Sequence, residues 1–465
     1  MNVLYIGGGF VGACSAAVTA DSGHQTLVFD IDQEKVRRLS SKDRDTIESC
    51  IHEDGLADLL IRNSDRISFT TDLEKVGQFV SELDAIFMCV PTPEKTDATG
   101  EADLSYYERS VAMIGPLLAK RDAKKRVVVI NKSTVPIHMI DYTRELFEKQ
   151  GVENFGSVAN PEFLVEGKAI EGSIHPDRVV VGANDQADFD IMRILLRRFY
   201  DSATVKYLEV NPYEAAAGKL LANFILFNKV VLSYDVIGRT CEYFKGLRYE
   251  HVRNILVADP RIGSWGLYDS LFAGGSCFIK DASSLAHQLE QAGTHAAMVR
   301  GTLDANIFQR DHFFGRAEAE AGFDWGKKHI ALLGIAFKQE TNDIRNSGAI
   351  ALIQQLLGSG VASIRVYDPA AMEECAKYFD IQKNDLYKRI SYAKSETEAL
   401  TGTDACLICT DWPQFKTVYD TITKAVPPPY LIMDGRRMLQ GQYSDLQAKG
   451  YDIVAVGSPF IQGVK

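Results

Sequence analysis

Short apolar runs alternate with amphipathic stretches over the first two hundred residues of the chain. Residues 3–6 are an apolar run that leads directly into a glycine-rich turn, and an alanine-rich segment follows as far as Ser22. Gly23 is typical of a helix stop, and a second apolar run, residues 26–29, ends in Asp30. This spacing predicts a strand-helix-strand unit with a right-handed crossover.

Two more apolar runs in this half end in polar loops. Residues 85–90 lead into the loop 91–93, and residues 126–130 lead into the loop 131–134. Because ligands bind beyond the carboxyl ends of parallel strands, these loops are candidate binding segments.

A different pattern begins near Tyr213 and continues to Phe244. Apolar residues recur there at spacings of three and four, and few helix breakers interrupt them. The pattern predicts one helix of about 45 Å, long enough to link domains and to pack a subunit interface.

From about Lys327 the chain returns to alternating strand and helix patterns. Residues 329–334 and 404–410 predict strands, and residues 363–368 end in an acid as residues 26–30 do. The sequence therefore predicts an α/β protein with two Rossmann-like doubly wound domains, the second lacking the full glycine fingerprint, joined by a central helical domain with a long helix. We place the domains at 1–208, 209–310 and 311–465.

Length and composition are consistent with this division. A chain of 465 residues is too long for one core, and its net charge of -11 argues against nucleic-acid binding. The nine histidines show no metal-ligand spacing. Cys406 and Cys409 lie in an apolar run and are expected to be structural thiols, so no metal is predicted. No charged leader or long apolar span precedes the first strand, which predicts a reducing, cytoplasmic location without a membrane.

The glycine-rich turn carries the first chemical signal. Gly7, Gly9 and Gly12 fit G-x-G-x-x-G between a strand and a helix, where a pyrophosphate meets backbone N–H groups. Asp30 can accept from both ribose hydroxyls and would repel a 2′-phosphate, which favours NAD over NADP. Asp32 is the competing acid.

The second signal is a cysteine far downstream. Cys277 follows two glycines, where backbone can approach a substrate, and Lys280 and Asp281 follow it. A nearby lysine favours the nucleophilic thiolate. Taken alone, such a cysteine is more often a buried, inert side chain.

Other polar pairs have two interpretations each. Glu162 and Glu166 are four residues apart, a spacing that would place both on one helix face, either as catalytic groups or as a solvated helix start. Lys219 and Asn223 are also four apart and would hold an oxyanion or form an ordinary polar face. Arg261 would clamp a phosphate or lie on the surface.

Taken together and in order, these segments resemble the UDP-glucose/GDP-mannose dehydrogenase family along essentially the whole chain. The matching segments are residues 7–12, 90–93, 132–136, 160–167, 219–223, 274–281, 333–338 and 341–345. The resemblance makes Cys277 a catalytic thiol. The run from Gly274 to Asp281 is most similar to the branches that act on UDP-glucose or GDP-mannose, and residues 261–263 are similar to the UDP-glucose branch.

The resemblance implies a four-electron, NAD-dependent oxidation of UDP-glucose at C6 to UDP-glucuronate through a cysteine thiohemiacetal and thioester. It also implies a homodimer, with Arg261 contacting substrate in the neighbouring subunit. The implied catalytic residues are Thr134, Glu162, Lys219, Asn223, Cys277 and Asp281. The implied cofactor contacts are Gly7, Gly9, Phe10, Val11, Gly12, Asp30, Lys35, Ser133, Thr134, Glu166, Lys280 and Arg345. The implied substrate contacts are Glu162, Phe163, Leu164, Lys219, Asn223, Arg261, Gly274, Lys338 and Arg437.

Two segments depart from the family pattern. Residues 264–273 lack the usual spacing of glycine, phenylalanine and lysine, and Ser233-Tyr234-Asp235 replaces an Asn-Glu on the long helix. The first departure bears on the sugar, so GDP-mannose or another UDP-hexose stays an alternative substrate. A nucleotide-sensing scaffold without turnover is the alternative from another functional class.

Overall fold

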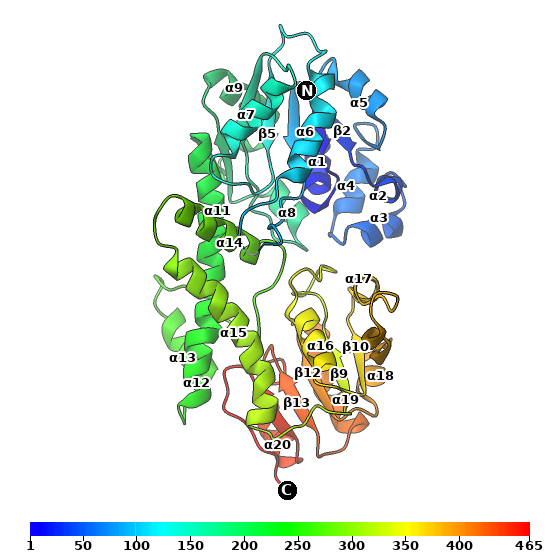
Figure 1. Ribbon diagram of the computed structural model, residues 1–465, viewed down its shortest axis with the longest axis vertical. Helices are drawn as coiled ribbons and strands as arrows, with labels where there is room; N and C mark the ends of the chain where they lie inside the picture. The colour runs from blue at the N-terminus through cyan, green and yellow to red at the C-terminus, as the bar shows by residue number, and fades with distance from the viewer. Residues whose placement is uncertain (98) are drawn as a thin grey trace. The chain divides into compact units, whose positions relative to one another are not determined.

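The computed structural model describes residues 1–97 and 99–465. The chain divides into two compact units, one made of Met1–Ala222 with Ser283–His295 and the other of Asn223–Ala282 with Ala296–Lys465. Each unit is built on one sheet with helices on its faces (Figure 1). The strands are mostly continuous buried runs, as expected for parallel sheets covered on both faces.

The first sheet has eight strands in the order β3-β2-β1-β4-β5-β6-β7-β8. The order of the first six is that of the doubly wound dinucleotide-binding fold. Neighbouring strands are parallel except β6 and β7, which pair antiparallel. The strands are β1 (Asn2–Ile6), β2 (Gln25–Phe29), β3 (Ile67–Thr70), β4 (Ala85–Met88), β5 (Val127–Asn131), β6 (Phe155–Ala159), β7 (Arg178–Gly182) and β8 (Lys206–Val210).

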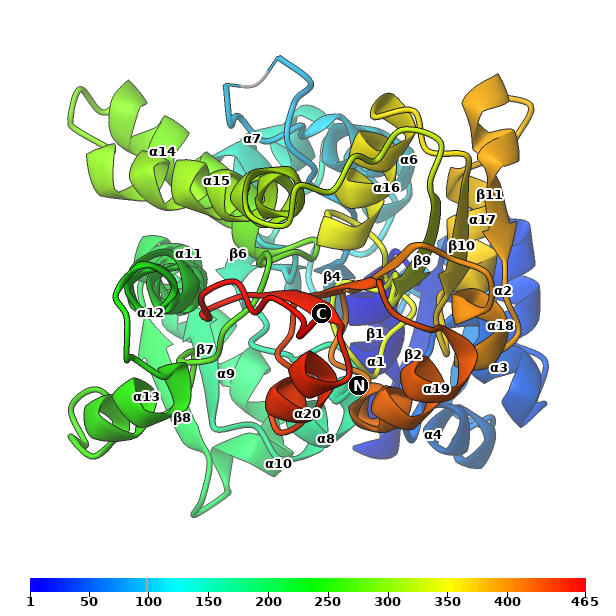
Figure 2. The same cartoon turned by 90° about the horizontal axis from the view of Figure 1, so that it is seen from below.

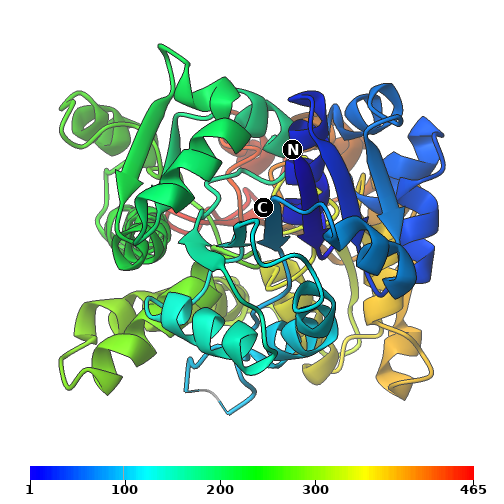
Figure 3. The same cartoon turned by 90° about the horizontal axis from the view of Figure 1, so that it is seen from above.

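Helices cover both faces of the first sheet and form a separate core with each face. One core includes apolar residues of α1, α4, α8 and α9, and the other includes apolar residues of α5, α6 and α7. In Figure 3, α6 and α7 (cyan) lie on one side of the sheet. The helices are α1 (Phe10–Asp21), α2 (Gln33–Leu39), α3 (Arg44–Cys50), α4 (Leu56–Arg62), α5 (Leu73–Val80), α6 (Ser105–Leu118), α7 (Met139–Lys149), α8 (Ala169–Ile174), α9 (Gln186–Leu195) and α10 (Arg197–Tyr200).

A helical region joins the two sheets, and the predicted long helix is confirmed. Pro212–Tyr243 is helical without a break over 32 residues, with a π-helical turn inside it. By length and composition alone it could cross a membrane, but one such helix is weak evidence because the core helix of a globular protein has the same character. The helices are α11 (Pro212–Leu232), η1 (Ser233–Gly238), α12 (Arg239–Tyr243), α13 (Tyr249–Val257), α14 (Phe278–Gln291) and α15 (Ala297–Ala319).

The second sheet has six parallel strands in the order β11-β10-β9-β12-β13-β14, which repeats the doubly wound order. Figure 2 shows α16 on one face of this sheet and α19 and α20 on the other. The elements are β9 (His329–Leu333), α16 (Gly348–Gly358), β10 (Ser363–Tyr367), α17 (Met372–Tyr378), η2 (Asp385–Arg389), β11 (Ile390–Tyr392), α18 (Glu396–Leu400), β12 (Ala405–Ile408), η3 (Pro413–Thr417), α19 (Val418–Ala425), β13 (Leu431–Asp434), α20 (Tyr443–Ala448) and β14 (Asp452–Ala455). The predicted fold class is confirmed.

An acid ends the second strand of each sheet, but the two acids have different surroundings. Asp368 is 1% exposed, and its carboxylate accepts the backbone N–H of Ile335 at 2.6 Å and of Ala336 at 3.0 Å. It also accepts the indole N–H of Trp412 at 3.1 Å and the backbone N–H groups of residues 370 and 371. Asp368 therefore holds the turn after β9 to the turn after β10, and these donors occupy both of its oxygens.

We predict that Asp368→Asn destabilises the second unit by about 2–4 kcal/mol, because the new amide group turns its own N–H toward buried donors. Urea unfolding followed by tryptophan fluorescence measures this, since all three tryptophans (residues 265, 325 and 412) lie in the second unit. Asp420→Asn, at an exposed carboxylate of the same unit, is the matched control and should shift the midpoint little. Equal midpoints for the two variants would contradict the assignment.

Candidate functional site

The three motif glycines lie between the end of β1 and the first turn of α1, and each has different surroundings. Gly7 has φ +100°, and a Cβ there would lie 2.5 Å from the carbonyl oxygen of Cys89. A Cβ at Gly12 would lie 1.9 Å from the carbonyl oxygen of Gly7, so helix and strand touch there. A Cβ at Gly9 meets nothing within 4 Å, which leaves room for a phosphate at the start of α1, where Phe10 and Val11 form the first turn.

Asp30 lies beside this turn, and its hydrogen-bond partners differ from those of Asp32, the competing acid. One Asp30 oxygen accepts the N–H of Gly8 at 2.7 Å and the amine of Lys35 at 3.1 Å. Asp32 instead caps α2 by accepting the N–H of Lys35. Asp30, beside the glycine turn and paired with Lys35, therefore stays the candidate for a ribose contact.

The loops after β4 and β5 are joined at the same sheet edge. The hydroxyl of Ser133 donates to the carbonyl of Val90 at 2.7 Å, and the hydroxyl of Thr92 donates to the carbonyl of Thr134 at 2.7 Å. These bonds fix Ser133 and Thr134 beyond the carboxyl ends of the strands, the edge at which doubly wound sheets bind ligands.

The prediction that Glu162 and Glu166 share a helix face is wrong. Residues 160–165 form an irregular segment after β6, a turn follows, and α8 begins only at Ala169. The carboxylate of Glu162 turns back to accept the N–H of Leu164 at 2.6 Å. A local side-chain bond of this kind competes with helix formation.

Glu162 and Lys219 form a buried ion pair. The amine of Lys219 lies 2.9 Å from a Glu162 oxygen, and the two residues are 3% and 9% exposed. The ring of Phe163 lies against this pair, with the Lys219 amine 5.4 Å and the Arg178 guanidinium 3.8 Å from its centroid. The structure thus brings Glu162, Phe163 and Lys219 together.

Lys132 belongs to the same group of charges and is not among the predicted site residues. Its amine donates to the side-chain oxygen of Asn160 at 3.0 Å. Burial lowers the pKa of Lys132, the carboxylate of Glu162 opposes that shift, and the charge of Lys219 adds to it. The only signal in the sequence is its position in the 132–136 segment of the family pattern.

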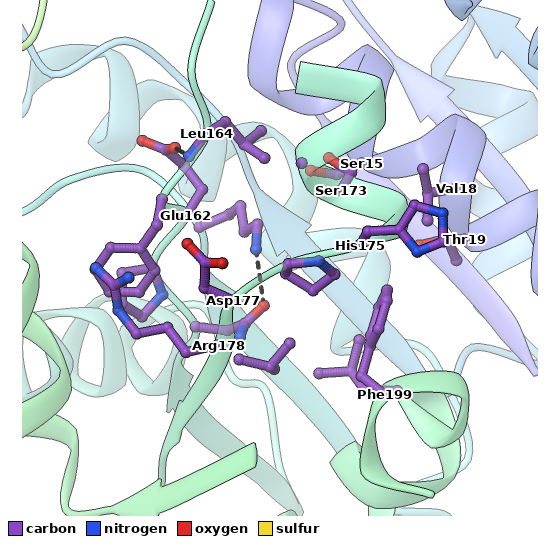
Figure 4. A pocket seen from close by; sticks show the side chains of 18 of the residues that line it. Ser15, Val18, Thr19, Glu162, Leu164, Ser173, His175, Asp177, Arg178 and Phe199 are labelled. Atoms are coloured by element: carbon purple, nitrogen blue, oxygen red, sulfur yellow. Dashed lines mark hydrogen bonds between the residues drawn. The ribbon is translucent and has the colours of Figure 1, made fainter. Parts of the chain in front are cut away.

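A cavity of about 330 Å³ lies next to these residues in the first unit. Figure 4 shows the side chains around it, with Glu162, Leu164 and Arg178 on one side and His175 and Thr19 on the other. Its wall includes Lys132, Asn160 and Phe163. The cavity is therefore bounded in part by the predicted catalytic and substrate residues, and it mixes apolar walls with a few charges.

Cys277 is exposed and directly precedes α14. The N–H of Asp281 donates to its carbonyl at 2.9 Å, so the cysteine begins a helix whose dipole stabilises negative charge at the sulfur. Close packing inside the protein, and not only the approach of a substrate, requires glycine at positions 274 and 275. A Cβ at Gly275 would lie 2.9 Å from the ring of Phe337, and one at Gly274 would lie 2.4 Å from the carbonyl oxygen of Asn346.

Asp281 is fully buried and holds two of the predicted residues. It accepts the side-chain amide of Asn223 at 2.6 Å and the amine of Lys280 at 2.6 Å. Lys280 is thus paired with Asp281, which binds Asn223 through its other oxygen. Lys219 and Asn223 lie one turn apart on α11.

The remaining candidates are separate side chains with partners of their own. Arg261 is 88% exposed and pairs with Asp259, and Arg345 pairs with Asp343. Arg437 is buried, pairs with Glu250 and donates to the carbonyl of residue 456. The amine of Lys338 lies 5.8 Å from the ring centroid of Phe337.

The six predicted catalytic residues fall on both units. Thr134, Glu162 and Lys219 belong to the first unit, and Asn223, Cys277 and Asp281 belong to the second. Over residues 1–97 and 99–465 no cluster of histidine, cysteine and acid side chains could hold a metal ion.

The comparisons with known proteins cover the whole chain. Three models of the UDP-glucose/GDP-mannose dehydrogenase family match in sequence order: the NAD binding domain over residues 1–200, the central domain over 213–307 and the UDP binding domain over 331–441.

Relatives and solved structures match over comparable lengths. UDP-glucose 6-dehydrogenase TuaD of Bacillus subtilis is 32% identical, covering 100% of this chain and 95% of its own. UDP-glucose 6-dehydrogenase of Gallus gallus is 31% identical, covering 98% and 93%. The structure of a UDP-glucose dehydrogenase from Pyrobaculum islandicum has a TM-score of 0.83 and 27% identity, covering 99% and 98%. A UDP-D-ManNAc dehydrogenase from Pyrococcus horikoshii shares the fold, with a TM-score of 0.81 and 22% identity, covering 98% and 99%.

The open glycine turn and Asp30 fit the dinucleotide that these matches require, and NAD is the cofactor. The UDP binding domain calls for a nucleotide sugar as substrate. The chain therefore belongs to the UDP-glucose/GDP-mannose dehydrogenase family and is an NAD-dependent dehydrogenase of a nucleotide sugar.

Proposed function

We propose that the protein oxidises UDP-glucose at C6 to UDP-glucuronate in two NAD-dependent steps. The observation that carries the proposal is an exposed thiol, Cys277, at the start of α14 and one helical turn before the buried Asp281. A single oxidation of an alcohol needs no such nucleophile, whereas oxidation of an aldehyde to an acid is easier through a thioester. The relatives named UDP-glucose 6-dehydrogenase support the choice of sugar.

In the first oxidation the C6 alcohol loses a hydride and a proton. NAD, when bound, accepts a hydride in each oxidation. Asp281 takes the proton through a water that Thr134 helps to hold. Asn223 and Lys280 hold the Asp281 carboxylate in its orientation, because both donate to it.

In the second oxidation the sulfur of Cys277 adds to the aldehyde carbon, and the oxygen is protonated to give a thiohemiacetal. Loss of a second hydride and a proton then leaves a thioester. Lys219 and Asn223, one turn apart on α11, stabilise the oxyanion formed at this carbon. Glu162 activates the water that breaks the C–S bond, which returns the thiol and leaves the acid.

The other residues bind the two ligands in this scheme. The residues that contact NAD are Gly7 to Gly12, Asp30, Lys35, Ser133, Glu166, Lys280 and Arg345. The residues that contact the sugar nucleotide are Phe163, Leu164, Arg261, Gly274, Lys338 and Arg437. We assign residues 1–208 to NAD, 209–310 to the centre and dimer, and 311–465 to the UDP-sugar.

We also propose a cytoplasmic homodimer built on the long helix. Leu221, Ile225, Leu232 and Val236 follow one another along a single face at helical spacing, and all are exposed. An exposed apolar stripe of this kind suits contact with the same stripe on a second copy of the chain.

The first test is a panel of sugar nucleotides followed by NADH absorbance. We predict two NADH for each UDP-glucose, with GDP-mannose and UDP-galactose slower by on the order of a hundredfold, since a misplaced hydroxyl loses a buried hydrogen bond. One NADH per sugar would reject the acid as product. A faster rate with another sugar nucleotide would change the substrate, and no NADH with any of them would favour a sensing scaffold.

The second test removes the thiol. We predict that Cys277→Ala lowers the rate of acid formation by on the order of a thousandfold or more, because no thioester can form. Chromatography of the product separates UDP-glucose from UDP-glucuronate. Cys50→Ala, at a partly exposed thiol outside the scheme, controls for loss of a cysteine and should keep its rate. Full acid production by Cys277→Ala would end the covalent scheme.

The third test concerns hydrolysis of the thioester. We predict that Glu162→Gln slows turnover by on the order of a hundredfold and lets an acyl group accumulate on the protein, because an amide cannot take a proton from water. Mass spectrometry of the intact protein detects the adduct after mixing with UDP-glucose and NAD. The double variant Glu162→Gln/Cys277→Ala should show no adduct. Wild-type turnover without an adduct in the single variant would remove Glu162 from this role.

A further inference from the structure

A buried acid outside the catalytic set holds the loop that carries Glu162 and Glu166. Glu53 lies in the turn between α3 and α4 and is 2% exposed. Its two carboxylate oxygens accept backbone N–H groups from a distant segment: one accepts from Gly167 and the other from Ala169 at 2.8 Å. A buried carboxylate with two N–H donors is a fixed charged acceptor and not a mobile side chain.

The backbone N–H groups that bind Glu53 lie at the end of the loop that carries Glu162 and Glu166. Gly167 follows Glu166 directly and has φ +86°, and Ala169 is the first residue of α8. Lys168, at the N-cap of α8, makes no side-chain cap bond, so Glu53 supplies the acceptor from another part of the chain. The turn also packs on α8, because a Cβ at Gly55 would lie 3.4 Å from the side chain of Ile170.

The loop is thus held at both ends. The ion pair of Glu162 with Lys219 fixes its start, and Glu53 fixes its end. Both Glu53 and Glu166 also act on α1: burial is the first cause that raises the pKa of Cys14 on that helix, and the charges of these two acids raise it further. Glu53 and Glu166 therefore lie near the helix that begins at the glycine turn, and α8 packs against it.

We propose that Glu53 is a positioning residue for the cofactor: by binding the N–H groups of Gly167 and Ala169 it holds Glu166 at the NAD side of the site. It touches neither ligand and acts through the loop. The inference rests on the proposed role of Glu166, whereas the use of NAD follows from the family.

The test measures NAD affinity directly, by calorimetry on the protein without any sugar. In Glu53→Gln one buried N–H loses its acceptor and faces an amide N–H, so we expect the Kd for NAD to rise about tenfold. Asp54→Asn changes the next residue along the chain, an exposed carboxylate, and is the matched control with an affinity within about twofold of wild type. Glu53→Asp keeps the charge but is one methylene shorter, so it should fall between the two and carries the test if Glu53→Gln does not fold.

A double-mutant cycle separates positioning from a general loss of stability. If Glu53 acts through Glu166, then Glu53→Gln with Glu166→Gln should bind NAD no more weakly than Glu166→Gln alone. Additive losses would overturn the proposal, as would unchanged NAD affinity in both folded Glu53 variants, even with a lower melting temperature. Because the measurement needs no sugar, it stands even if no sugar nucleotide is oxidised.

Discussion

The ion pair between Glu162 and Lys219 is the contact on which the proposed chemistry depends. Two charges removed from water cost free energy unless they satisfy each other, and here the amine and the carboxylate do so at 2.9 Å. The segment after β6 stays irregular because its backbone N–H groups bind carboxylates. The N–H of Leu164 binds Glu162, and the N–H of Gly167 binds Glu53. A helix there would need those same donors, so the acids that hold the segment also prevent a helix from forming.

This competition explains which parts of the site could be predicted from the sequence and which could not. The geometry at Gly7 and Gly12 could be predicted from a local pattern, because Gly7 directly follows β1 and a Cβ at Gly12 would meet Gly7 itself. Asp30 could be predicted for the same reason, as it directly ends its strand. The helix expected over Glu162 and Glu166 was wrong because one of the bonds against it comes from Glu53, more than a hundred residues earlier. No local pattern contains such a contact.

The two sheets show how one fold serves different ends. Both repeat the doubly wound order, and a glycine with positive φ follows the first strand of each, Gly7 in one and Gly334 in the other. In the second sheet Ile335 and Ala336 stand where Gly8 and Gly9 stand in the first, and Asp368 is enclosed by donors. The second turn lacks the open glycine of the first, and its acid is used to stabilise the fold. The repeated pattern in the sequence predicted the repeated architecture, whereas the enclosure of Asp368 depends on the indole of Trp412 and on backbone N–H groups of the turn after β9, which only the folded sheet brings together.

The two segments that depart from the family pattern are linked through Asn306 on α15, whose side-chain oxygen accepts the hydroxyl of Tyr234 and the N–H of Ala273. A Cβ at Gly238, the last residue of the π-helical turn, would lie 2.7 Å from the carboxylate of Asp269 in the segment 264–273. Asn306 on α15 binds both the N–H and the carbonyl of Ala273. Burial raises the pKa of Asp269 well above its usual range. A buried acid packed on a glycine leaves little freedom on either side, because a larger residue at one position requires a smaller one at the other. The atypical loop and the atypical turn are therefore one packing unit, and a substitution in one of them limits the residues that fit in the other.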